Sequence, residues 1–116
     1  MAGAATVLNM SILDPSTPPL KPAELFVLAV LRDGPLHGYG IVQQVAARSQ
    51  GRIRIRPGNL YRVLDRMLER GLIEPAGHRG SGEERRTEYR MTTVGRKVAQ
   101  AEARVLAGAI AALLAT

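Results

Sequence analysis

The stretch from Pro57 to Arg70 has the clearest helical pattern in the chain and places two kinds of surface on one helix. Apolar side chains recur at helical spacing and share one face: Leu60, Val63, Leu64, Met67 and Leu68. The other face is polar: Asn59, Arg62, Asp65, Arg66 and Glu69. Pro57 suits the first turn of such a helix, and Gly71 suits its end. We therefore expect one face to join a core and the arginine-bearing face to meet an external partner.

The charge of the chain indicates that this partner is a polyanion. The formal net charge is +6 over 116 residues, and it is unevenly spread. Residues 48–70 carry seven arginines against Asp65 and Glu69, a net charge of +5. Residues 1–47 carry a net charge of −1, residues 71–90 carry 0 and residues 91–116 carry +2. Positive charge concentrated around one helix is typical of proteins that bind nucleic acid.

The composition excludes several other classes of protein. The chain has no cysteine, so it has no disulfide framework and no thiolate metal site. Its N-terminus lacks the pattern of a signal peptide. The longest apolar run, from Val105 to Ala115, is shorter than the ~18 residues of a membrane span. We expect a cytoplasmic protein of one domain plus an arm, with no cofactor, no metal and no membrane partner.

The order of the patterns predicts helices on both sides of a small hairpin. Residues 1–19 are dotted with prolines and are expected to form a flexible arm, with at most a short strand or turn near residues 7–13. The predicted helices cover residues 23–32, about 37 to 48, 57–70 and about 93 to 115.

Two kinds of strand are expected. Residues 52–56 alternate between arginine and isoleucine, which predicts a short strand with the isoleucines inward. Residues 72–74 begin a second strand, a glycine-rich turn covers residues 77–82, and residues 86–91 return as its partner. The predicted fold is mainly α with a small β-hairpin: a winged helix-turn-helix over residues 20–91 and a C-terminal dimerisation helix over residues 92–116.

Several segments in this order resemble the PadR family of bacterial transcriptional regulators, in its subgroup with a short C-terminal part. The resemblance runs from Leu20 to about Arg96 and rests on four segments: LHGYGI at 36–41, PGNLYRVL at 57–64, GLIE at 71–74 and YRMTTVGR at 89–96. Asn59 stands where many members carry threonine, and Gly40 where an acidic residue is common. The resemblance implies a homodimer and a small-molecule effector, for which Phe26 is a candidate contact.

The predicted DNA-binding residues come from the recognition helix, its neighbour and the wing. Arginine pairs well with guanine and asparagine with adenine, so Arg62 and Asn59 are expected to read bases in the major groove. The full set is Tyr39, Asn59, Tyr61, Arg62, Arg66, Arg79 and Arg86. For Tyr39 and Tyr61 the contact is what the resemblance implies, and the alternative is packing between their two helices. The alternative for the helix is a solvated face with internal salt bridges. The arginines at 52, 54 and 56 face either solvent or phosphate.

The final helix carries more apolar surface than a small monomer can cover, which favours dimerisation over packing against the first helix alone. The predicted interface consists of Val98, Ala101, Val105, Leu106, Ala109, Ala112 and Leu113. Together these features predict a sequence-specific regulator, a repressor, on a palindromic operator in double-stranded DNA. The alternative is a winged-helix module that binds another protein. The sequence contains no pattern of catalytic groups, so we do not expect an enzyme.

Overall fold

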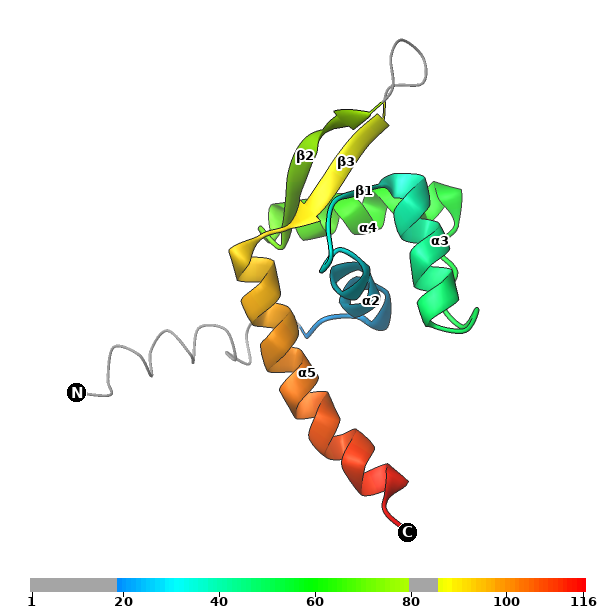
Figure 1. Ribbon diagram of the computed structural model, residues 1–116, viewed down its shortest axis with the longest axis vertical. Coiled ribbons are helices and arrows are strands. Elements are labelled where there is room, and N and C mark those ends of the chain that lie inside the picture. Colours follow the sequence, from blue (N-terminus) through cyan, green and yellow to red (C-terminus); the bar gives the residue numbers. More distant parts are fainter. Residues whose placement is uncertain (1–18, 80–85) are drawn as a thin grey trace, which may run out of the picture.

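The computed structural model describes residues 19–79 and 86–116, and it places a bundle of helices beneath a small sheet (Figure 1). The elements in chain order are α2 (Pro22–Val30), β1 (Leu36–His37), α3 (Gly38–Arg48), α4 (Pro57–Glu69), β2 (Ile73–Arg79), β3 (Arg86–Met91) and α5 (Thr93–Leu114). The predicted class, mainly α with a small β-hairpin, is confirmed. The arm and the strand or turn predicted within it lie outside the described residues, apart from Pro19.

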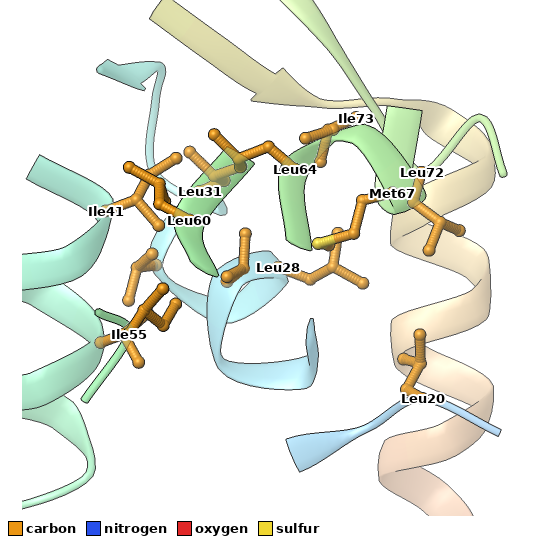
Figure 2. Packing of buried hydrophobic residues seen from close by; sticks show 13 residues of the cluster. Leu20, Leu28, Leu31, Ile41, Ile55, Leu60, Leu64, Met67, Leu72 and Ile73 are labelled. Carbon is orange, nitrogen blue, oxygen red and sulfur yellow. The ribbon is translucent and has the colours of Figure 1, made fainter. Parts of the chain in front are cut away.

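Helix α4 is built as the periodicity predicted, with its apolar face in the centre of the core. Leu60, Leu64 and Met67 are buried on this face, in one cluster with Leu28 of α2 (Figure 2). Pro57 occupies the first turn of the helix. Gly71 ends it in the left-handed region, with a φ of +71°, which favours a residue without a side chain. The core therefore fixes which face of α4 meets solvent.

One charged residue, Glu24, lies inside this core between α2 and α4. Its side chain is only 2% exposed. Glu24 Oε1 accepts a hydrogen bond from the Lys21 backbone N–H at 2.8 Å, which closes the start of α2. Its carboxylate also lies 3.5 Å from Arg66 Nε and 3.7 Å from Arg70 Nη1. A buried carboxylate requires such partners, so Glu24 joins the start of α2 to the last turns of α4.

The sheet differs from the prediction in the identity of its third strand. The strand order is β1-β3-β2, and both pairs are antiparallel. Leu36 and His37 pair with Tyr89 and Glu88, whereas residues 52–56 join no strand. The predicted strand at 52–56 is wrong, although its alternation is real: Ile55 is buried, and the arginines are exposed. Alternation shows which side chains face inward, but a strand also needs a backbone partner.

The hairpin also turns later than predicted. Strand β2 continues through Gly77 to Arg79, where the prediction placed the start of the glycine-rich turn. A register shift between Pro75 and Gly77 marks a β-bulge, and Gly77 has a φ of +112°. The bulge uses the conformational freedom of Gly77 inside the strand. The rest of the predicted turn, residues 80–82, lies outside the described residues.

Helix α5 is attached to the domain at the end of α4. Thr92 caps α5 by accepting a hydrogen bond from the Gly95 N–H at 2.9 Å, and its own hydroxyl donates to the Gly71 carbonyl. A Cβ atom built on Gly95 would overlap the Leu72 carbonyl oxygen. The helix can approach the chain this closely only because residue 95 has no side chain. Beyond this contact α5 runs away from the sheet (Figure 1).

We predict that Gly95→Ala destabilises the protein by about 1–3 kcal/mol, because the new methyl group forces α5 away from Leu72. Urea unfolding measures the loss. Gly58→Ala is the matched control, since a Cβ there meets no atom within 4 Å and alanine favours a helix. Equal stability changes in the two variants would contradict the close contact at Gly95.

Candidate nucleic-acid interface

The solvent face of α4 presents the residues predicted to read DNA. Asn59, Tyr61 and Arg62 are all exposed in the first two turns, and the Tyr61 side chain keeps 67% of its surface. Tyr39, in the first turn of α3, is 62% exposed. A bulky aromatic residue this exposed is unusual in a small domain, where tyrosine tends to be partly buried. The face is therefore open to a partner.

A groove of about 460 Å³ connects this face to the wing. It lies between the starts of α3 and α4 and the strand β3. The groove brings together three predicted residues from three elements, namely Tyr39, Tyr61 and Arg86. Arg86 also pairs with Arg79 at the end of the β2–β3 ladder, so the two wing arginines share one register position. Tyr39, Tyr61 and Arg86, which are distant in the sequence, thus line one groove.

A second hollow, of about 580 Å³, lies beside the first turns of α4. Its lining consists of Arg54, Arg56, Gly58, Asn59 and Arg62. Among the residues that the structure describes, none of its three arginines forms an ion pair with a carboxylate. The hollow therefore concentrates positive charge beside the predicted base-reading residues.

Arg66 is not brought together with the other predicted DNA-binding residues. Its guanidinium turns toward Glu24, and its side chain is 42% exposed. The helical pattern placed Arg66 correctly near the polar face, but a long side chain at the edge of that face can reach back to a buried carboxylate. A role in contacting DNA stays a prediction for this residue, and its observed partner is internal.

Both histidines have local partners. His37 caps α3, because its Nδ1 accepts a hydrogen bond from the Gly40 N–H at 3.1 Å. His78 Nδ1 lies 3.2 Å from the Thr87 hydroxyl across the hairpin. Within residues 19–79 and 86–116, no group of three or more His, Cys, Asp or Glu side chains is placed to hold a metal ion. Over the same residues, no helix is long and apolar enough to cross a membrane.

The predicted dimer residues divide into two groups along α5. Val98 and Ala101 are half-buried in the part of the helix nearest the domain. The others are exposed: Val105, Leu106, Ala109, Ala112 and Leu113. Phe26 is half-buried against the core and lines neither of the two hollows, so its contact with an effector stays a prediction.

The arrangement of α3, α4 and the wing is that of a winged helix-turn-helix, and comparison with known proteins assigns the family. Residues 27–101 match the model of the transcriptional regulator PadR-like family. The chain belongs to this family.

Known PadR-like structures share the fold of this chain. The regulator from Eggerthella lenta is 26% identical, with a TM-score of 0.60 over 100% of this chain and 99% of its own. Bacillus subtilis PadR in complex with operator DNA is 19% identical, with a TM-score of 0.61 over 69% of this chain and 46% of its own.

The curated relative is longer than this PadR-like chain. It is an uncharacterised 37.1 kDa protein of a Streptomyces fradiae transposon, 35% identical over 88 residues. The match covers 73% of the present chain but only 23% of that protein. The chain thus spans about a quarter of the length of the relative it matches.

The PadR-like fold also reveals residues that sequence reasoning left open. Arg54 and Arg56 line the second hollow beside Arg62, whereas the sequence could not decide between solvent and phosphate for them. Their shared orientation could be read from the alternation with Ile53 and Ile55. Their position next to the start of α4 could not, because it depends on how the chain turns after α3.

Tyr89 is a further residue of the groove, and its environment differs from that of the exposed tyrosines. It is half-buried on β3. Burial raises the pKa of the Tyr89 hydroxyl above its ordinary value, and the nearby Tyr61 and Asp65 add to the rise. The fold therefore favours the neutral hydroxyl of Tyr89.

This pKa shift predicts a loss of stability at alkaline pH. Because the pKa of Tyr89 is raised in the folded state, the stabilisation is complete below about pH 10 and is lost as the pH rises through the folded pKa. Tyr89→Phe should make the alkaline fall in unfolding free energy shallower, measured by urea unfolding across this range. Tyr39→Phe is the control on an exposed tyrosine of the same groove; an equal effect of both variants would contradict the prediction.

Proposed function

We propose that this protein is a homodimeric, sequence-specific regulator that binds a palindromic operator in double-stranded DNA and represses transcription. The observation that carries the proposal is the exposed face of α4, where Asn59, Tyr61 and Arg62 project from a helix whose opposite face is buried. The similar fold of Bacillus subtilis PadR, which is solved with operator DNA, supports it.

In this proposal α4 enters the major groove with its first two turns. Arg62 donates to the O6 and N7 acceptors of a guanine, and Asn59 pairs with the edge of an adenine. Tyr39, Tyr61 and Arg86 surround the adjoining groove, so the backbone strand that borders the major groove would lie between α3 and the wing. Arg79 belongs to the same wing.

Selection of bound fragments from random duplex DNA tests the proposal directly. The selected fragments should share a palindromic consensus. The affinity for unrelated duplexes should fall steeply with salt, whereas the ratio of the affinities for consensus and unrelated duplexes should change much less. A promoter carrying that consensus should lose output in the presence of the protein. Recovery of no consensus would instead favour a winged-helix module that binds another protein.

We predict that Arg62→Ala costs about 1–3 kcal/mol on the consensus and relaxes preference at one base position. Titration of labelled consensus and single-base variants measures both effects. Arg48→Ala removes the same formal charge at the far end of α3, where Arg48 lies 3.8 Å from Asp33, and should leave the preference intact. An equal loss for Arg62→Ala on every duplex would assign Arg62 to the backbone only.

A second copy of the chain is proposed to cover the outer half of α5. Val105 is 65% exposed and Leu113 is 84% exposed, although both are apolar and lie on one side of the helix. The neighbouring alanines allow a second helix to approach closely. A twofold pair would set two copies of α4 on half-sites about one helical turn, ~34 Å, apart.

We predict that Val105→Glu with Leu106→Glu yields a monomer, because four carboxylates would meet at the interface of two copies. Light scattering measures the mass, and the variant should bind the palindrome much more weakly than the wild-type dimer. Ala107→Glu with Ala111→Glu adds the same charge on the opposite side of α5 and should preserve the dimer. An unchanged mass of the first variant would exclude this interface.

A further inference from the structure

The hollow lined by Arg54, Arg56 and Arg62 has a role that reading of bases by α4 does not explain. We propose that it binds one backbone phosphate of the duplex, with Arg54 and Arg56 as the phosphate ligands. The proposal rests on the proposed function and deepens it, because it adds a backbone contact at a hollow distinct from the groove beside the wing. The sequence of the DNA would not matter for this contact.

The arrangement of charge in the hollow favours an anion. Three guanidinium groups line one space of about 580 Å³. Among the described residues no carboxylate lies within ion-pair distance of Arg54, Arg56 or Arg62. Like charges gathered on one surface repel each other, and an anion between them adds an attraction to each that offsets this repulsion. A phosphodiester presents two charged oxygens, which suits guanidinium donors.

Arg54 is held in place before any ligand arrives. Its Nε donates a hydrogen bond to the Gly51 carbonyl at 3.1 Å. Gln50 and Gly51 both have a positive φ, of 56° and 79°, so the chain turns tightly enough after α3 for this contact. With Nε engaged, the terminal nitrogens of Arg54 are left for a ligand. A side chain fixed in this way loses less entropy on binding.

The segment that carries both arginines is anchored from its inner side. Ile55 is buried in the core, and the Ile53 N–H donates to the Ser49 hydroxyl at 2.9 Å. Alternation along this extended segment then directs Arg54 and Arg56 outward together. Arg56 immediately precedes α4, and its side chain makes no capping hydrogen bond. Among the described residues, no capping hydrogen bond and no ion pair occupies the Arg56 guanidinium.

The hollow shares two of its lining residues with the proposed base-reading face of α4. Asn59 and Arg62 line it as well as belonging to the exposed face of α4. At Gly58 an added Cβ would meet no atom within 4 Å, so the space beside the helix start is unfilled. A phosphate seated there would hold the first turn of α4 against the strand whose bases Asn59 and Arg62 read.

Salt-dependent titration of the consensus duplex and of an unrelated duplex tests the proposal with Arg54→Ala and Arg56→Ala. Each variant should weaken both complexes by the same factor, about tenfold, and lower the slope of log K against log salt by about one. Arg52→Ala is the control, since it removes the same charge from the same segment at a residue that does not line the hollow. An equal loss for Arg52→Ala would reduce the effect to general charge and overturn the proposal.

A duplex with single neutral methylphosphonates then locates the phosphate. One position should weaken binding of the wild-type protein, weaken binding of Arg54→Ala and of Arg56→Ala by a smaller factor, and have no further effect on the double variant that lacks both proposed ligands. If the wild type binds the consensus and no position behaves in this way, the hollow is not a phosphate site and the proposed function stands. If the wild type binds no duplex, both fail.

Discussion

Burial of the apolar face of α4 is the interaction on which the rest of the structure depends. Leu60, Leu64 and Met67 are each almost fully buried, and a side chain of this size contributes about 1.5–3 kcal/mol when it leaves water. An exposed ion pair contributes about 0–1 kcal/mol. Rotation of α4 by half a turn would expose these three side chains to water and bury Arg62. The orientation of the exposed polar face of α4 is therefore set mainly by packing, and exposed ion pairs contribute little to it.

The arginines of α4 and its C-cap fall into two groups, those that lie beside Glu24 and one that does not. Arg66 and Arg70, near the end of the helix, lie beside this buried carboxylate, so their charge is partly compensated inside the protein. Arg62, near the start, has no carboxylate partner among the described residues. The helix thus meets its proposed ligand with the end that retains its charge. Because Glu24 also closes the start of α2, one carboxylate connects the start of α2 with the last turns of α4.

Local patterns in the sequence were sufficient for most elements and insufficient for contacts between them. The period of apolar residues predicted α3, α4 and α5, because burial of one helical face leaves its trace within a single segment. The prediction of a strand at residues 52–56 was wrong. The free edge of β3 pairs instead with β1, where Leu36 lies opposite the distant Tyr89. The same difference between local patterns and distant contacts applies to the candidate site. Exposure of Arg62 was predictable, whereas the turn of Arg66 toward Glu24 depends on a residue 42 positions earlier.

The junction between α4 and α5 connects the two surfaces that the proposed function requires. Arg70 and Gly71 end α4, and Thr92 binds the carbonyl groups of Gly71 and Leu72 with its hydroxyl and its backbone N–H. Gly95 then lies directly over Leu72. Because the two backbones are in close contact here, a displacement of the start of α5 would also displace Leu72, which follows the end of α4. In the proposed homodimer, this junction would make the spacing of the two recognition helices follow the packing of the two α5 helices.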